Sequence, residues 1–127
     1  MKLLSPRVHG YLDYLLVALF AVAPFLFDLA ERPAILSWIV GLTLLVVSLL
    51  TAYPLGMVRV ISFPAHGALE LLAAIFLVLS PWVLGYSDEI ASRNFFLLTG
   101  LTLLGVWAVT DYRAAGLPVR PRREREA

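Results

Sequence analysis

The chain has 127 residues, of which 61% are apolar and 15% are charged, and its formal net charge at pH 7 is +1. Soluble domains carry roughly 25% charged residues, so this composition excludes an ordinary water-soluble domain and places the chain in a bilayer. The absence of cysteine excludes disulfides, thiolate metal sites and a cysteine nucleophile.

The first apolar run extends from about Val8 to Phe27. It is close to the roughly 17–25 residues that cross a hydrocarbon core as a helix. Lys2 and Arg7 precede it, as basic residues precede the apolar core of a signal peptide. Because a similar segment recurs in the middle of the chain, we expect the first run to be retained as a transmembrane helix.

Three further apolar runs follow, from about Ala34 to Leu50, from Ala65 to Leu84 and from Phe95 to Val109. Each again approaches the length of a membrane span. The sequence therefore predicts an all-α membrane protein with four transmembrane helices.

The second half of the chain repeats much of the first. His9-Gly10-Tyr11-Leu12-Asp13 opens the first run, and His66-Gly67-Ala68-Leu69-Glu70 opens the third, 57 residues later. A fixed period of this kind indicates internal duplication of one structural unit. Two later segments recur at a spacing of 59 residues, namely Gly41 to Leu45 as Gly100 to Leu104, and Thr51-Ala52-Tyr53 as Thr110-Asp111-Tyr112.

The even number of spans in each unit determines how the two units are oriented. Two spans return the chain to the side where it started, so both repeats enter from the same side as parallel helical hairpins. We expect the first repeat at residues 5–56 and the second at residues 57–112. Residues 113–127 are rich in Arg, Glu and Pro without apolar periodicity, which predicts a disordered basic tail.

The basic residues divide unequally between the two ends of the predicted bundle. Eight lie at the end that holds both termini, and two lie in the connections at the opposite end. By the positive-inside rule, both termini are expected to be cytoplasmic. The eight are Lys2, Arg7, Arg59, Arg113, Arg120, Arg122, Arg123 and Arg125, and the two are Arg32 and Arg93.

Two prolines lie near the ends of the first and third predicted helices. Pro24 and Pro81 lack the N–H that would bond to the carbonyls of Phe20 and Leu77, so each helix is expected to kink near its outer end. A nearby hydroxyl can donate to such a freed carbonyl. Ser80 is the candidate donor in the second repeat, and the first repeat has no hydroxyl at the equivalent position.

Seven Tyr and Trp residues lie near the ends of the predicted spans. Aromatic rings at such positions are typical of anchors at the membrane interface, and we prefer this interpretation to an aromatic ligand cage. They are Trp38, Trp82 and Tyr86 at the outer end and Tyr11, Tyr14, Tyr53 and Tyr112 at the inner end.

Ser80-Pro81-Trp82, in a two-helix unit that opens with His-Gly-x-Leu-acid, resembles the SPW-repeat family of small multi-pass membrane proteins. The resemblance covers roughly Ser5 to Tyr112. Val8 to Tyr14 and Ser80 to Gly85 carry its V-H-G-x-L-D-Y and A/S-P-W-x-x-G patterns, whereas the first repeat has Asp28 in place of the glycine. The resemblance implies a bacterial inner-membrane protein with no established activity.

Two pairs of ionisable residues have matching positions in the two repeats. His9 and Asp13, like His66 and Glu70, are four residues apart, which places each pair on one helix face about 6 Å apart along the axis. Parallel repeats bring the pairs to one depth, and Asp111, at the end of the fourth predicted helix, reaches the same side. The sequence therefore predicts a structural cluster of two imidazoles and up to three carboxylates at the cytoplasmic ends of the helices.

Three interpretations of this cluster remain open. In the first, Asp13 and Glu70 accept hydrogen bonds from the histidines or from tyrosine hydroxyls and hold the helix ends together. In the second, His9, Asp13, His66 and Glu70 bind a divalent transition metal such as zinc, iron or manganese, or the two histidines ligate haem b. In the third, the cluster serves proton-linked transport of a small molecule.

No motif in the chain points to catalysis. Walker, Gly-x-Ser-x-Gly and Rossmann patterns do not occur, so we expect no enzyme activity, no catalytic residue and no required cofactor. The sequence predicts a structural or assembly module of the membrane. Membrane lipid is the expected partner, four short spans allow self-association, and neither nucleic acid nor a small-molecule substrate is predicted.

Overall fold

The computed structural model describes residues 2–113. It contains α1 (Pro6–Leu26), α2 (Glu31–Leu49), α3 (Phe63–Val83) and α4 (Ile90–Val109), and all four helices are long and apolar enough to cross a membrane. Two isolated bridges are the only β-type pairings among the described residues. The prediction of an all-α protein with four spans is therefore confirmed. Apart from Arg113, the tail predicted at residues 113–127 lies outside the described residues.

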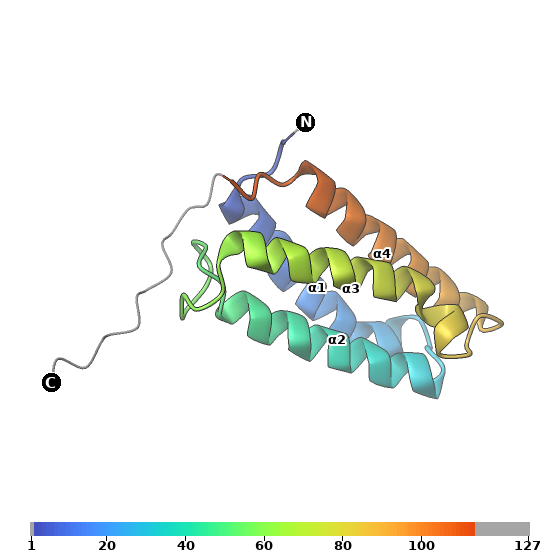
Figure 1. The fold of residues 1–127 in the computed structure, drawn as a ribbon. Helices are drawn as coiled ribbons and strands as arrows, with labels where there is room; N and C mark the ends of the chain where they lie inside the picture. The colour runs from blue at the N-terminus through green and yellow to red at the C-terminus, as the bar shows by residue number, and fades with distance from the viewer. Residues whose placement is uncertain (1, 114–127) are drawn as a thin grey trace, which may run out of the picture.

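The helices pack mainly as two hairpins, α1 against α2 and α3 against α4. Figure 1 shows α1 and α3 running in the same direction, with both hairpin loops at one end of the bundle. The N terminus and the connection at residues 50–62 lie at the opposite end, which we call the terminal end, and the end with the two hairpin loops is the loop end.

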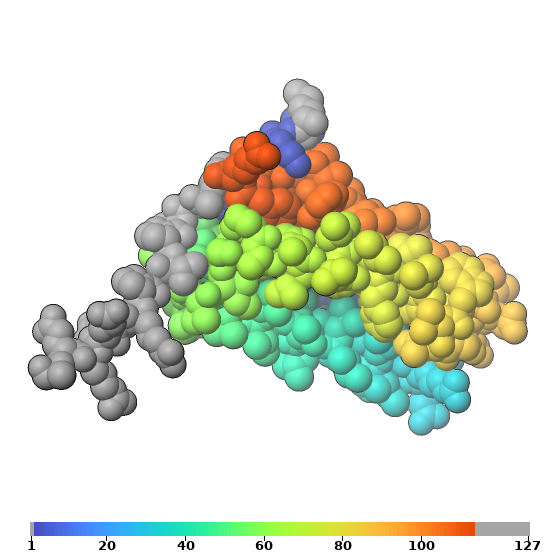
Figure 2. All heavy atoms as spheres, viewed as in Figure 1, coloured from blue at the N-terminus to red at the C-terminus, as the bar shows by residue number. Residues whose placement is uncertain are grey.

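The surface of the bundle is largely apolar, as contact with lipid requires. Figure 2 shows α3 lying between α2 and α4 on one face, with α1 mostly hidden behind them. Large apolar side chains such as Leu15, Leu42, Leu72 and Leu98 are each at least 64% exposed in the isolated chain. A water-soluble monomer rarely exposes so much contiguous apolar surface, so this surface is suited to the hydrocarbon core.

All four helices begin before the predicted apolar runs, and α2 and α4 do so by the largest margin. α2 starts at Glu31 rather than Ala34, and α4 starts at Ile90 rather than Phe95. The added first turns contain Arg32 and Arg93. Arginine is a good helix former but lowers local hydropathy, so a search for apolar runs misses the polar first turn of a helix.

Matching serine caps start α1 and α3. The hydroxyl of Ser5 accepts from the Val8 N–H at 3.3 Å, and that of Ser62 accepts from the Ala65 N–H at 3.2 Å. A proline lies in the first turn of each helix, where a missing N–H leaves no helical bond unmade. The caps define where each helix begins and thereby set the position of the histidine four residues after each serine.

α1 and α3 also end in the same way. Asp28 and Gly85, which follow these helices, have φ values of 48° and 74° in the left-handed region. The next N–H bonds back to the proline carbonyl of its own helix, at 3.2 Å for Leu29 and 2.8 Å for Tyr86, which is the closing bond of a Schellman motif. Glycine suits this position best, and aspartate is among the few other residues that tolerate it, which explains the difference between the repeats.

Hydroxyl groups compensate for the two helix prolines. Ser80 donates to the Leu77 carbonyl at 2.7 Å, which confirms the prediction for the second repeat. In the first repeat, Ser37 of α2 donates to the Phe20 carbonyl at 2.6 Å. The sequence offered no candidate here because the donor comes from the partner helix of the hairpin. Both prolines lie inside their helices, and the kinks at Pro24 and Pro81 stay predictions.

Glycines allow close approach within each hairpin. A Cβ built on Gly41 would lie 3.0 Å from the Cβ of Phe20, and one on Gly100 would lie 3.0 Å from the backbone nitrogen of Val78. Small residues of this kind let helix backbones pack closely in membranes. The recurring glycine therefore has the same role in both repeats.

Candidate functional site

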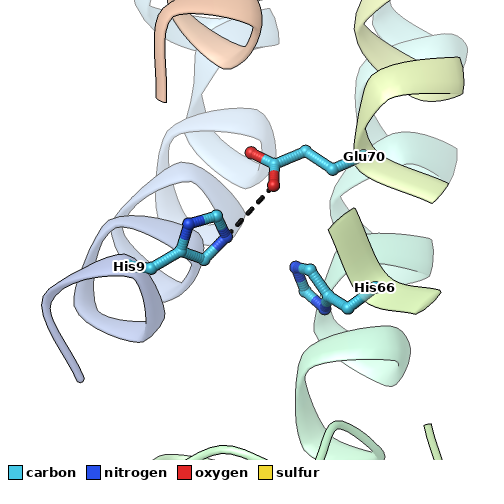
Figure 3. A group of neighbouring side chains, drawn as sticks. All are labelled: His9, His66 and Glu70. Carbon is cyan, nitrogen blue, oxygen red and sulfur yellow. Dashed lines mark ion pairs between the residues drawn. The ribbon is translucent and has the colours of Figure 1, made fainter. Parts of the chain in front are cut away.

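The two predicted histidine–acid pairs meet at the terminal end between α1 and α3. His9 Nε2 lies 3.3 Å from Asp13 Oδ1 and 3.1 Å from Glu70 Oε2, and His66 Nε2 lies 3.2 Å from Asp13 Oδ2. All four side chains are at least 95% buried. Figure 3 shows His9, His66 and Glu70 facing one another from the two helices. We call these four residues the His/carboxylate cluster.

Each histidine is held from behind by a threonine of the other repeat. His9 Nδ1 lies 2.8 Å from Thr110 Oγ1, and His66 Nδ1 lies 2.8 Å from Thr51 Oγ1. Each threonine hydroxyl is also 2.6 Å from the backbone carbonyl four residues earlier and donates its proton there. The threonine oxygen must therefore accept from the ring, so Nδ1 carries a proton and Nε2 is the nitrogen that faces the carboxylates.

Each carboxylate is held by a tyrosine of its own repeat. The Tyr53 hydroxyl donates to Asp13 Oδ2 at 3.0 Å, and the Tyr112 hydroxyl donates to Glu70 Oε2 at 2.6 Å. Burial, and next the nearby carboxylate, raise the pKa of both phenols, so both hydroxyls remain protonated donors. The interpretation of Tyr53 and Tyr112 as interfacial anchors is wrong, because a buried acceptor holds each hydroxyl inside the bundle.

The anchor interpretation fails for Tyr86 as well. Tyr86 is 3% exposed, and its hydroxyl bonds to Ser80. Trp38 and Trp82, in contrast, are 44% and 58% exposed near the loop end, as interfacial rings should be. Tyr11 is 59% exposed at the terminal end, and the hydroxyl of half-buried Tyr14 donates to the Leu55 carbonyl at 2.8 Å.

The glycine that follows each histidine makes room for a tyrosine ring. A Cβ on Gly10 would lie 3.0 Å from Tyr53 Cε2, and one on Gly67 would lie 2.8 Å from Tyr112 Cε1. The separation at Gly67 is shorter than real side chains show, and the one at Gly10 would require the Tyr53 ring to shift. The His-Gly pair of each repeat thus has two functions, since the histidine enters the cluster and the glycine admits the ring that reaches the carboxylate.

Phe63 covers the cluster at the terminal end. Its ring centroid lies 5.2 Å from that of His9, 5.6 Å from that of Tyr53 and 4.8 Å from that of Tyr112. Phe63 is 1% exposed. The cluster is therefore separated from water at this end by a layer of aromatic rings, which strengthens the electrostatic interactions inside it.

Two short backbone pairings position the threonines. Leu4 forms a parallel bridge with Thr110, and Ile61 forms one with Thr51. The N–H groups of Leu4 and Ile61 donate to the carbonyls before these threonines at 3.0 and 2.8 Å. Thr51 and Thr110 were visible in the sequence only as part of a repeated motif, and the structure adds both to the site.

Asp111 occupies a different place from the predicted one. α4 ends at Val109, and Thr110 follows as a cap with extended backbone, so Asp111 is not on the helix. Its carboxylate accepts from the Arg113 N–H at 3.1 Å, and its own N–H donates to the Leu4 carbonyl at 3.1 Å. Leu4 pairs with this segment where the backbone leaves the helical path, so the prediction that Asp111 lies on the fourth helix is wrong.

Four buried atoms of the cluster lack a hydrogen-bond partner: His9 Nε2, His66 Nε2, Asp13 Oδ1 and Glu70 Oε1. The two nitrogens lie within ion-pair distance of carboxylate oxygens, yet these contacts do not meet the angular requirement for an N–H···O bond. Such contacts are not counted as hydrogen bonds despite their short distance, because a hydrogen bond weakens steeply when donor and acceptor are misaligned. The two ring nitrogens therefore lie beside carboxylate oxygens without forming hydrogen bonds to them.

A cavity of about 310 Å³ between α2 and α3 reaches two cluster residues. His66 and Glu70 contribute to its wall, and the rest of the lining is apolar except for Thr43. A second cavity of about 460 Å³ lies between α1 and α4 and is lined by no residue of the cluster.

The comparisons with known proteins agree with this architecture. A family model described as the SPW repeat domain matches residues 7–110, a range that contains both hairpins and the whole His/carboxylate cluster. No curated protein and no solved structure matches the chain.

Proposed function

The chain belongs to the SPW repeat family, and from this premise we propose that it is a non-enzymatic membrane module whose two hairpins are locked together by the His/carboxylate cluster. Four apolar helices and the family both support an integral membrane protein. The observation that carries the proposal is the exchange of partners between repeats, in which each histidine bonds to a threonine of the other hairpin.

Polar contacts matter more for joining these hairpins than they would in water. Lipid tails are as apolar as leucine, so helices in a membrane gain little from burying apolar surface against one another. The contacts of His9 with Thr110 and Glu70, and of His66 with Thr51 and Asp13, all cross from one hairpin to the other. Removal of one partner from any of these contacts takes away an interaction from a buried polar group that cannot reach water instead.

We propose a cytoplasmic location for the terminal end, in the inner membrane of a bacterium. Lys2, Arg7, Arg59 and Arg113 support this orientation because they gather at that end, whereas Arg32 and Arg93 belong to the opposite end. Membership of the SPW repeat family supports the bacterial inner membrane as the proposed location. Membrane lipid is the proposed partner of the exposed apolar surface.

A double-mutant cycle tests the lock. Thr51→Val removes the hydroxyl that holds His66, His66→Ala removes the ring, and the double variant removes both. Each single change should lower the free energy of unfolding in detergent by about 1–3 kcal/mol, and the double variant should lose clearly less than the sum.

Thr102→Val is the matched control for this cycle. Thr102 donates to the Leu98 carbonyl at 2.7 Å as Thr51 does to its own helix, but it is exposed and holds no histidine. Its change should have little effect. Strictly additive losses for Thr51→Val and His66→Ala, or equal losses for Thr51→Val and Thr102→Val, would overturn the lock.

A further inference from the structure

We propose that the His/carboxylate cluster is a binding site for one divalent first-row transition metal ion. The ligands are Nε2 of His9, Nε2 of His66 and the carboxylate of Glu70, and Asp13 is the adjacent fourth donor. This inference goes beyond a structural lock, because it assigns a ligand to the space between the four side chains.

Three nitrogen–oxygen pairs in the cluster already have the separation that a small tetrahedral site requires. With metal–ligand distances of 2.0–2.1 Å, two ligands of a tetrahedral ion lie about 3.3 Å apart. The nitrogen–oxygen distances in the cluster are 3.1, 3.2 and 3.3 Å. One donor atom each from His9, His66 and Glu70 lies within 4.8 Å of the others, so closure around an ion requires a contraction of about 1.5 Å at most.

The histidine nitrogens point to a missing ligand. Both histidine rings are at least 99% buried, so water does not reach them. Even so, His9 Nε2 and His66 Nε2 have no hydrogen-bond partner. Buried polar atoms in native proteins are almost always satisfied, so two orphan nitrogens beside carboxylates indicate an unfilled coordination requirement. An ion between Nε2 and the carboxylate oxygens would satisfy both nitrogens at once.

The surroundings orient the ligands as they do in known metal sites. A metal-binding histidine usually donates its second ring N–H to an acceptor that fixes the tautomer, and Thr110 and Thr51 accept from Nδ1 of His9 and His66 at 2.8 Å. A ligating carboxylate is itself usually hydrogen-bonded, and Tyr112 donates to Glu70 at 2.6 Å. A neutral ring with its proton on Nδ1 presents the Nε2 lone pair to the centre of the cluster, as a metal ligand must.

Charge and donor type identify the class of ion. As metal ligands both imidazoles are neutral, and with the two carboxylates they carry a formal charge of −2, which a divalent cation neutralises. The mixture of nitrogen and oxygen donors suits zinc, iron, manganese or cobalt better than calcium or magnesium, which prefer oxygen ligands alone. The absence of thiolates disfavours copper(I).

The same geometry argues against haem as the ligand. A porphyrin between His9 and His66 would have to displace Asp13 and Glu70, whose oxygens lie 3.1–3.3 Å from the imidazole nitrogens. The ring centroids of the two histidines are 5.4 Å apart and inclined by 79°, with Phe63 packed against both. A compact ion fits this space, and a flat macrocycle does not.

The test measures zinc bound to the full chain. The protein is purified in detergent without a polyhistidine tag, stripped with a chelator and dialysed against buffered Zn²⁺, and the bound metal is determined by elemental analysis. We expect about one zinc per chain, and Co²⁺ in place of Zn²⁺ should give the intense visible absorption of a tetrahedral site. Chelation should lower the Tm of the loaded protein.

Variants separate the cluster from adventitious binding. Glu70→Gln and His66→Gln should each lower zinc affinity at least tenfold. Thr51→Val should lower it by about 10–100-fold through loss of the bond that orients His66. Asp28→Asn, at the loop end and far from the cluster, is the control and should bind zinc as the parent does.

Two results would overturn the metal site: less than a tenth of a zinc per parent chain, or equal zinc in the parent and in both Gln variants. If circular dichroism shows that either Gln variant does not fold, the Co²⁺ absorption spectrum of the Thr51→Val variant tests the metal site instead. The lock proposal stands apart from this test, because its double-mutant cycle is measured in excess chelator.

Discussion

His9 and Thr110 lie 101 residues apart in the chain and 2.8 Å apart in the structure, joined by a hydrogen bond between Nδ1 and Oγ1. The bond ties the first turn of α1 to the end of α4. Its counterpart joins His66 to Thr51 between α3 and the end of α2. Because the partners are exchanged between repeats, neither hairpin can complete its own histidine site, and the two units depend on each other.

The spacing between Gly67 and Tyr112 predicts a large effect of one methyl group. A Cβ at position 67 would lie 2.8–2.9 Å from three ring atoms of Tyr112, so Gly67→Ala should displace the ring from Glu70 and lower stability by about 1–3 kcal/mol. Gly105→Ala is the control, since a Cβ there meets no described atom within 4 Å. It should be neutral or stabilise α4 by up to about 1 kcal/mol. Thermal unfolding in detergent compares the two, and equal effects would contradict the steric role of Gly67.

Removal of the Tyr112 hydroxyl should weaken the cluster without creating a cavity. Tyr112→Phe deletes only the donor to Glu70 Oε2, and the expected loss is about 1–3 kcal/mol because a buried carboxylate loses a partner. Tyr11→Phe makes the same chemical change at a side chain that is 59% exposed and should cost much less. Chemical denaturation of both variants checks the difference.

Ser37 and Pro24 should be energetically coupled. Ser37→Ala leaves the Phe20 carbonyl without a donor and should cost about 1–3 kcal/mol in the parent protein. When Pro24→Ala is also present, the restored backbone N–H supplies that carbonyl, so the same serine change should cost less. Unfolding of the parent, both single variants and the double variant measures this coupling, and additive effects would show that Ser37 does not compensate for the proline.

The two cluster tyrosines should make stability fall at alkaline pH. Burial raises the pKa of Tyr53 and Tyr112 in the folded state, whereas an unfolded tyrosine ionises near pH 10. The stabilisation is fully present below about pH 10 and is lost as the pH rises further, because only the unfolded chain releases these protons readily. A variant with both tyrosines changed to Phe should lose stability less steeply over that range, as followed by the Tm.

The topology can be tested independently of the cluster. With eight basic residues at the terminal end and two at the opposite end, a C-terminal reporter that is active only outside the cytoplasm should remain silent. The same reporter fused after Asp28, in the first hairpin loop, should be active. The reverse pattern would show that the terminal end faces outward.

The amino-acid sequence by itself determined the four spans and the position of the two histidine–acid pairs. Apolar runs of membrane-spanning length are unambiguous because few other structures tolerate them, and residues four apart on a helix must share a face. The repeated segments then placed His9 and His66 at one depth. These inferences succeed because they depend on local periodicity and on the number of spans.

Tertiary structure alone decided which residues complete the site. Tyr53 and Tyr112 stand at span ends, where an interfacial anchor and a buried hydrogen-bond donor have the same sequence signature. Thr51, Thr110 and Ser37 act on partners in another helix, and Asp111 leaves the helical path because Leu4 pairs with its backbone. Such contacts depend on where the chain returns in space, and periodicity along one helix carries no information about that.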